Sequence, residues 1–272
     1  MKTGSHINET YAAAAFSKQS IVFDQLYGDD EIIRYKRERV RAHMLRLLSS
    51  SGKLLELNCG TGEDALFFAQ NGFSVHATDI SEAMLEVVNA KLSLLGDLPV
   101  RTEQCSFTQL DQLREQGPFD AVYSNFGGLN CTGELASVLG SLKPLVRPGG
   151  TVTLVIISPF CLWETLLFFK GKFTTAFRRF FSGSGRRAHV EGVYFNCWYY
   201  TPRFVRKQMG DAFEEISTEG LCSLVPPSYI DGFAKKYPGL FRFLRKKEDR
   251  LKCAWPWKAM GDYFIISFKR KG

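Results

Sequence analysis

The sequence predicts an α/β fold: a doubly wound, mostly parallel sheet of seven strands, with an α+β cap formed by insertions. Three observations predict it. Short apolar runs alternate with helical patterns between residues 53 and 158, and a glycine-rich turn follows the first run. The chain has 272 residues, of which 45% are hydrophobic, which is enough for one large core and a cap.

The first five strands are predicted at residues 53–57, 74–79, 100–105, 119–124 and 151–158. Their continuous apolar runs are typical of parallel strands that are buried on both faces. Helices are expected at 63–70, 82–91 and 134–146, and Ser81 suits the N-cap of the second helix. Residues 147–150 are predicted to form a turn before the fifth strand.

The composition changes after Pro159. Residues 160–181 are aromatic, basic and roughly helical, and residues 190–200 alternate like strands. Thr201 and Pro202 suit the N-cap and first turn of a helix. The sixth and seventh strands are expected at 214–221 and 263–268, and the N-terminal part is helical from about Glu31.

These features predict a single domain over residues 1–272. An N-terminal helical segment (1–50) precedes a core made of 51–159, 201–222 and 261–272. The cap consists of insertions at 160–200 and 223–260. We expect it to lie over the carboxyl ends of the strands, where open α/β sheets bind ligands.

Charge and cysteine usage narrow the class of protein. Residues 160–260 carry 18 Lys and Arg against nine Asp and Glu, which indicates an acidic substrate, an anionic membrane surface, nucleic acid or simply a solvated basic face. The seven cysteines are scattered singly, so neither a metal site nor a disulfide framework is predicted. The start lacks the order of a signal peptide and no apolar run approaches the ~20 residues of a membrane span, so a cytoplasmic protein is expected.

The sequence of the glycine-rich turn indicates which kind of cofactor it could bind. A dinucleotide-binding turn has the pattern G-x-G-x-x-G, and the matching positions are Asn58, Gly60 and Glu63. Because a carboxylate at Glu63 would repel a pyrophosphate, an adenosine cofactor without phosphates suits the turn better.

The segment ELNCGTG (56–62) resembles the first motif, E/D-x-G-x-G-x-G, of class I S-adenosylmethionine-dependent methyltransferases, whose fold is Rossmann-like. Asn58 stands in place of a glycine, and Asn tolerates a left-handed backbone. TDIS (78–81) resembles the segment that binds the ribose, CSFTQL (105–110) the segment beside the adenine, and FDAVYSNFGG (119–128) the fourth-strand motif. The resemblance implies S-adenosylmethionine as cofactor, bound by Glu56, Asn58, Gly60, Gly62, Asp79, Ile80, Met84, Ser106, Phe107, Asn125 and Phe126.

Methyl transfer is an in-line displacement that depends mainly on alignment, so no dedicated nucleophile is required. Weak candidates for a base are His189, Tyr199 and Tyr200, with Glu191 and Asn130 as further possibilities; each is more often structural than catalytic.

The insertions are expected to select the acceptor. Their aromatic residues predict a small, lipophilic or aromatic methyl acceptor, although the same residues could instead attach the cap to the core. An acidic group on the acceptor would pair with Arg178, Arg179, Arg186 or Arg187. The aromatic residues concerned are Trp163, Phe168, Phe169, Phe173, Phe177, Phe180, Phe181, Trp198, Tyr199, Tyr200, Tyr229, Trp255 and Trp257.

Three other functions remain open. A nucleic-acid (RNA) methyltransferase would use the basic cap, but the segment SNFG (124–127) differs from the Asn/Asp-Pro-Pro-Tyr/Phe of base methyltransferases. A non-enzymatic membrane-associated module is the second, because residues 160–181 mix aromatic with basic side chains and could contact a membrane peripherally. An oxidoreductase is the third, and Glu63 opposes it.

Overall fold

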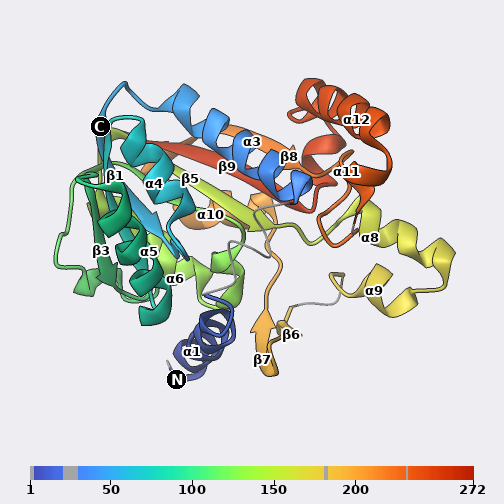
Figure 1. Cartoon of the computed structure of the whole chain (residues 1–272), viewed down its shortest axis with the longest axis horizontal. Helices are drawn as coiled ribbons and strands as arrows, with labels where there is room; N and C mark the ends of the chain where they lie inside the picture. The colour runs from blue at the N-terminus through green and yellow to red at the C-terminus, as the bar shows by residue number, and fades with distance from the viewer. Residues whose placement is uncertain (1–2, 21–29, 181–182, 231) are drawn as a thin grey trace.

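The computed structural model describes residues 3–20, 30–180, 183–230 and 232–272. Its main feature is a seven-stranded sheet in the order β3-β2-β1-β4-β5-β9-β8. All neighbouring strands are parallel except at β9, which is antiparallel to both β5 and β8. Helices lie on both faces of the sheet (Figure 1), so the predicted fold class is confirmed.

The parallel strands agree closely with the apolar runs of the sequence. They are β1 (Gly52–Leu57), β2 (Phe73–Asp79), β3 (Val100–Gln104), β4 (Phe119–Ser124) and β5 (Val146–Ile157). The neighbours Leu54 and Leu55 of β1 are both fully buried, in core clusters on opposite faces of the sheet. A central strand covered on both faces therefore reads as a continuous apolar run.

The strand β5 differs from the prediction at its start. Residues 147–150, expected as a turn, belong to the strand, which begins at Val146. Gly149 has a φ of +77°, and the pairing with β4 is irregular between Phe119 and Ala121. The glycines therefore make an irregular strand start rather than a separate turn.

Four α-helices connect these strands: α4 (Glu63–Gln70), α5 (Glu82–Leu95), α6 (Leu135–Gly140) and α7 (Leu142–Leu145). The last two replace the single helix predicted at 134–146. Pro144 explains the division, because its ring would clash with the carbonyl of Gly140 in an unbroken helix. Ser81 caps α5 as predicted: its Oγ accepts a hydrogen bond from Met84 N at 3.2 Å.

The described residues of the N-terminal part form α1 (Thr3–Ser17) and α3 (Glu31–Leu47). Only α3 lies in the range predicted to be helical from about Glu31. Asn8 attaches α1 to the rest of the molecule. Its Nδ2 donates to the carbonyls of Cys131 (2.7 Å) and Asn196 (3.0 Å), and its Oδ1 accepts from Asn196 N at 2.6 Å. The helix α1 therefore lies against the hairpin of the first insertion.

In the described part of the first insertion, short helices stand where one helical span was predicted at 160–181. A hairpin follows, which begins before the strands predicted at 190–200. The elements are α8 (Leu162–Leu166), α9 (Phe173–Phe177), β6 (Arg186–Val190) and β7 (Val193–Cys197). A 3-10 turn, Leu167–Lys170, ends at Gly171 with a φ of +71°, which interrupts the helical span. A glycine tolerates this left-handed conformation without strain.

The last part of the chain contains α10 (Pro202–Met209), β8 (Phe213–Leu221), α11 (Phe233–Lys236), α12 (Pro238–Leu251) and β9 (Tyr263–Arg270). Thr201 Oγ1 caps α10 by accepting from Phe204 N at 3.1 Å, as the sequence predicts. In Figure 1, α8, α9, α11 and α12 lie together at one end of the molecule. Within the described ranges, no helix combines the length and hydropathy that a membrane span requires.

Candidate functional site

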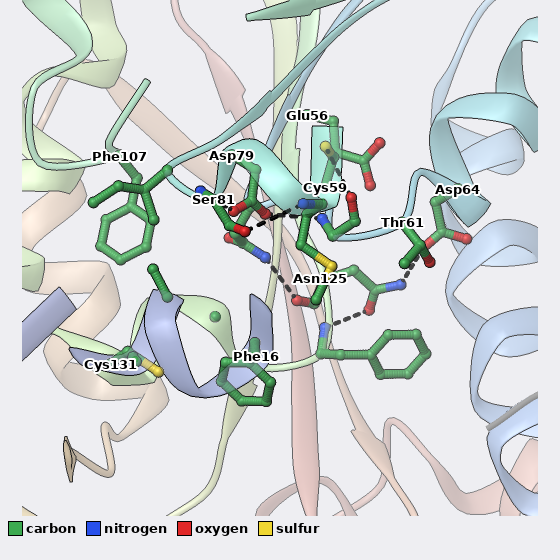
Figure 2. Close-up of a pocket in the computed structure, with 18 of the residues that line it drawn as sticks. Phe16, Glu56, Cys59, Thr61, Asp64, Asp79, Ser81, Phe107, Asn125 and Cys131 are labelled. Carbon is green, nitrogen blue, oxygen red and sulfur yellow. Dashed lines mark hydrogen bonds between the residues drawn. The ribbon is translucent and has the colours of Figure 1, made fainter. Parts of the chain in front are cut away.

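A pocket lies beyond the carboxyl ends of β1, β2 and β4. The strand order reverses between β1 and β4, so the loops that follow them diverge and leave a crevice. Figure 2 shows Glu56 and Asp79 on one side of this pocket and Phe16 and Cys131 on the other. Strand ends and α1 therefore enclose it together.

The pocket brings together most of the residues that the sequence singled out. Nine of them line it: Glu56, Asn58, Gly60, Asp79, Ile80, Met84, Phe107, Asn125 and Phe126. Gly62 and Ser106 do not. An alanine Cβ at Gly62 would lie 2.8 Å from Val88 Cγ2, so this glycine allows α4 and α5 to pack closely. Ser106 Oγ donates to Glu9 Oε2 at 2.6 Å and so contacts α1.

Asn58 takes the place of the first glycine without distorting the turn. Its φ is +52°, in the left-handed region that Asn tolerates. Its Nδ2 donates to the carbonyl of Asn125 at 3.1 Å, and its Oδ1 accepts from Ser124 Oγ at 2.6 Å. The side chain therefore joins the loop after β1 to the end of β4.

Gly128 makes room for this side chain. A Cβ at Gly128 would come within 2.4 Å of Asn58 Cγ. The asparagine and the glycine thus fit each other, although they lie far apart in the sequence.

Asp79 presents an acceptor pair at the end of β2. Its Oδ2 accepts from Gly60 N and its Oδ1 from Ser81 N, both at 2.9 Å. Burial raises the pKa of this carboxyl, and the backbone hydrogen bonds oppose that rise. The carboxylate is held in a fixed orientation in which its remaining lone pairs can accept from vicinal hydroxyls.

Glu56 is a buried acid. It is 3% exposed, and its Oε2 has no hydrogen-bond partner among the described residues. Burial and the nearby Asp64 carboxylate raise its pKa well above the ordinary value. Tyr123 and Arg41 act in the opposite direction, and a cationic ligand in the pocket would further favour the ionised carboxylate.

Asn125 and Glu63 are engaged within the protein. Asn125 Nδ2 donates to Asp64 Oδ2 at 2.6 Å, so its amide positions the loop. Glu63 pairs with Arg37 at 3.3 Å and with Lys91 at 2.8 Å. Its charge is therefore balanced locally, and the charge argument made from the sequence against dinucleotides does not hold by itself.

The helix α1 forms one wall of the pocket, which was not predicted from the sequence. Glu9, Ala12, Ala13 and Phe16 all line the pocket, and Ser17 Oγ lies 2.6 Å from Ser81 Oγ at the start of α5. The alanine run at 12–15 favours a helix, which was the available signal. Nothing in the local sequence indicates that this helix packs against the strand ends.

A second cavity adjoins the first. The two share Phe16, Arg37, Phe126, Gly128 and Cys131. We call it the outer chamber; its other lining residues are Ile33, Lys36, Gly127, Ile157, Ala188, Phe195, Cys197, Ser228 and Tyr263.

The prediction that aromatic residues of the insertions line the acceptor site is wrong for the residues that were named. Of the aromatic side chains named for that role, all those in the described part of the chain lie outside both cavity linings. Phe168, Phe169 and Phe173 are 42%, 81% and 56% exposed. Phe168 packs edge-on against the rings of Phe169 and Phe173, so these side chains contact one another and not the cavities. Phe181 lies outside the described residues.

The four arginines proposed to bind an acidic acceptor are also engaged elsewhere. Arg178 Nε and Arg179 Nε donate to Glu164 Oε2 at 3.0 and 2.9 Å, and Arg179 also pairs with Asp262 at 2.6 Å. Arg186 donates to the carbonyl of Arg178, and Arg187 stacks on Tyr194. These contacts hold the first insertion together.

The candidate bases lie outside both cavity linings as well. His189 is exposed and stacks on Tyr194, and the Tyr199 ring lies 5.3 Å from the guanidinium of Arg179. Tyr200 is buried in the core, where its hydroxyl donates to the carbonyl of Thr132. The geometry gives no support to a catalytic role for these three.

The two further candidates have structural partners. Asn130 Nδ2 donates to the carbonyls of Ile157 at 3.2 Å and Trp198 at 2.6 Å, which ties the loop after β4 to β5. Glu191 accepts a hydrogen bond from Gln19 Nε2 at 3.0 Å.

Residues 54–150 match the family model described as a methyltransferase domain. Over this segment the predicted resemblance to the class I S-adenosylmethionine-dependent methyltransferases is confirmed.

Relatives with different acceptors are similar to this chain. Over 147 residues, 52% of the chain, it is 30% identical to a demethylmenaquinone methyltransferase of Clavibacter sepedonicus, of which 56% is covered. Over 145 residues, 48% of the chain, it is 31% identical to glycine N-methyltransferase of Mus musculus, of which 48% is covered. The chain thus spans about half the length of these curated relatives.

A solved structure shares the fold over most of both chains. It is the magnesium protoporphyrin IX methyltransferase of Synechocystis PCC 6803, with a TM-score of 0.61, 16% identity, and coverage of 97% of this chain and 100% of that one.

The pocket residues fit the family's cofactor. S-adenosylmethionine carries a sulfonium and an ammonium group, and the pocket lining contains Glu9, Glu56, Glu63, Asp64 and Asp79. The buried Glu56 Oε2, which no described residue meets with a hydrogen bond, is the observation that fits a cationic ligand best.

Proposed function

We propose that this chain transfers the methyl group of S-adenosylmethionine to a small, lipophilic or aromatic acceptor bound in the outer chamber. The observation that carries the proposal is the continuity of the two cavities, which share Phe126 and Gly128 at the end of β4. In this proposal residues 1–272 form one methyltransferase domain, with core and cap divided as the sequence predicts.

Each pocket residue has a role in this proposal. Asp79 accepts hydrogen bonds from the ribose hydroxyls, and Ile80, Met84 and Phe107 contact the adenine. Glu56 compensates the positive charge of the methionine part, and Asn58 and Asn125 fix the loops around it. When bound, the cofactor supplies an electrophilic methyl group on a sulfonium.

In this proposal the outer chamber aligns the acceptor atom with the methyl group of the cofactor. Its lining is mostly apolar and includes the rings of Phe16, Phe126, Phe195 and Tyr263. Among the described residues no carboxylate or histidine lines it, so no general base is assigned. Holding an acceptor atom in line with the methyl group while water is excluded is the contribution that these residues can make.

The relatives support a small acceptor without naming it. One is named for demethylmenaquinone and another for glycine, and a similar fold is titled for magnesium protoporphyrin IX. The acceptor of this chain is therefore sought from the residues of its own chamber.

The test is a methyl-transfer assay. The purified protein is incubated with S-adenosylmethionine carrying a trideuterated methyl group and pools of small quinols, phenols, aromatic acids and amino acids. Mass spectrometry then detects products heavier by the labelled methyl group. The Asp79→Asn variant is the control, and labelled product in the wild type alone is the expected result. A wild type that binds no cofactor would contradict the proposal.

A second proposal concerns the outward aromatic surface formed by the 3-10 turn Leu167–Lys170 and the start of α9. Phe169 and Phe173 are largely exposed beside the exposed Lys170 and Lys172. Aromatic and basic side chains together favour the interface of an anionic membrane, so we propose peripheral membrane contact here, in preference to nucleic acid. Lipophilic acceptors could be taken up at such a surface.

Vesicle sedimentation tests this contact. Wild-type protein should sediment with vesicles that contain phosphatidylserine, and Phe169→Ser and Lys172→Glu should each weaken the binding. Because both side chains are exposed, the variants should melt at the wild-type temperature. Equal sedimentation of both variants and the wild type would count against the proposal.

A further inference from the structure

The two adjoining cavities differ in the charged residues that line them, although Arg37 lines both. The cofactor pocket is lined by five acidic residues, whereas the outer chamber is lined by Lys36 and Arg37 and, within the described chain, by no acidic residue. A cationic cofactor suits the first cavity. The second cavity would attract an anion, because charges of like sign gathered at an enclosed surface attract the opposite charge.

Lys36 is the residue that gives the outer chamber this property. It lies on α3 and is 5% exposed. Its Nζ donates to Ser228 Oγ at 3.3 Å and lies 5.1 Å from the ring centre of Tyr263 and 5.5 Å from that of Phe126. No carboxylate of the described residues lies within 4.0 Å of this ammonium group.

A buried ammonium held only by neutral groups has lost hydration that they do not fully replace. The rings of Tyr263 and Phe126 offer their negative faces, which is weaker compensation than a carboxylate gives. Ser228 accepts one of the three hydrogens that the ammonium can donate. The remaining donors lie at the wall of a cavity, where a ligand can meet them.

Arg37 occupies a different position. It lines both cavities, pairs with Glu63 at 3.3 Å, and its guanidinium carbon lies 5.8 Å from the centre of the Phe126 ring. The ion pair with Glu63 therefore neutralises part of the charge of Arg37 at the cofactor pocket. Lys36 belongs to the lining of the outer chamber alone.

We propose that Lys36 is a specificity-determining residue that binds an anionic group, a carboxylate or a phosphate, on the methyl acceptor. The inference rests on the proposed function of the outer chamber and narrows its substrate class. The acceptor then has an apolar or aromatic body that contacts Phe195, Ile157 and Phe16, with its anion at Lys36. In this proposal Lys36 takes the anion-binding role that the sequence predicted for the arginines of the first insertion.

The experiment measures the binding of a charged probe and its neutral counterpart. Protein saturated with S-adenosylhomocysteine is titrated with 2-naphthoate and with 2-naphthamide, which has the same aromatic body without the charge. Benzoate and phenyl phosphate distinguish a small carboxylate from a phosphate. The variants are Lys36→Met, Lys36→Arg and, as a matched control, Lys143→Met on an exposed part of α7.

The proposal predicts that the wild type binds an anionic probe at least tenfold more tightly than the amide. Lys36→Met should abolish that preference, while Lys36→Arg retains most of it and Lys143→Met retains all of it. Binding of S-adenosylhomocysteine to Lys36→Met should stay within twofold of the wild type, and its melting temperature should not fall.

Three outcomes would overturn the inference. The first is that the amide binds as tightly as the naphthoate, or that no anionic probe binds to the loaded wild type. The second is that Lys36→Met keeps the preference. The third is that Lys36→Met loses S-adenosylhomocysteine, which would place Lys36 at the carboxylate of the cofactor. If the wild type itself binds no S-adenosylhomocysteine, the proposed function fails first.

Discussion

Asn58 Nδ2 donates a 3.1 Å hydrogen bond to the carbonyl of Asn125, and this bond joins the two loops that diverge at the reversal of strand order. The side chain thus cross-links the walls of the cofactor pocket. A glycine at this position would keep the turn and lose the link. The departure from the family motif therefore has a structural role in this chain.

Replacing Asn58 tests that role. Asn58→Ala removes the hydrogen bonds and places a less tolerant residue at a φ of +52°, so unfolding free energy should fall by about 2 kcal/mol. Asn58→Gly loses the same bonds without the backbone strain and should cost about 1 kcal/mol less. Urea unfolding of both variants measures the difference. Equal stability of Asn58→Ala and wild type would exclude a cross-linking role.

Gly62 is predicted to be required for helix packing. Gly62→Ala places a Cβ 2.8 Å from Val88 Cγ2 at a φ of +77°, so it should destabilise the fold by roughly 2 to 4 kcal/mol. Gly140→Ala, where a Cβ meets nothing within 4 Å, is the matched control and should cost nothing. Chemical denaturation compares the two. If both variants unfold at the same denaturant concentration, the packing argument is wrong.

Asn8 should control how firmly α1 closes the pocket. Asn8→Ala removes the three hydrogen bonds to Cys131 and Asn196, so hydrogen exchange in α1 should accelerate. Because α1 forms one wall, affinity for S-adenosylhomocysteine should fall several-fold. Exchange mass spectrometry and calorimetry measure the two effects. Faster exchange in α1 with unchanged affinity would show that this wall is not needed for binding.

The pKa of Glu56 gives cofactor binding a pH dependence. Burial and Asp64 raise this pKa in the free protein, and a cationic ligand lowers it again, because it favours the ionised carboxylate. Between the bound and the free pKa, binding releases a proton, and affinity rises with pH. The contribution of Glu56 to the stability of the unliganded fold changes with pH in the opposite direction. The folded state holds more protons than the unfolded one in the window above the unfolded pKa, so this group's contribution falls as pH rises there.

Calorimetry in two buffers of different ionisation enthalpy measures this proton release. Wild type and Glu56→Gln are titrated with S-adenosylmethionine at several pH values. The wild type should release a proton in the window, and the variant should release less and show a flatter affinity profile. Identical proton release by both proteins would assign the titration to another group.

The sheet was predictable because its signals are local. Parallel strands buried on both faces, such as β1 and β4, read as apolar runs of the correct length. The helix interruption at Pro144 and the irregular start of β5 were missed, since propensity over a longer span favoured a simpler pattern.

The residues of the cofactor pocket were predictable where they lie at or directly after the end of a strand. Glu56, Asp79 and Asn125 each stand at or directly after a strand, and parallel strands bring these positions to one edge. The contribution of Phe16 and the position of Lys36 depend on how α1 and α3 pack against the sheet. Burial of Lys36 against two aromatic rings is a tertiary property without a sequence signal of its own.

The most direct test of the account is calorimetric titration with S-adenosylhomocysteine, with NAD as the control ligand and Asp79→Asn as the control protein. The account predicts binding of S-adenosylhomocysteine by the wild type but not of NAD. It also predicts an affinity loss of roughly 10- to 100-fold in Asp79→Asn, since hydrogen bonds to a charged acceptor are weakened. A folded wild type that binds NAD instead, or neither ligand, would contradict it.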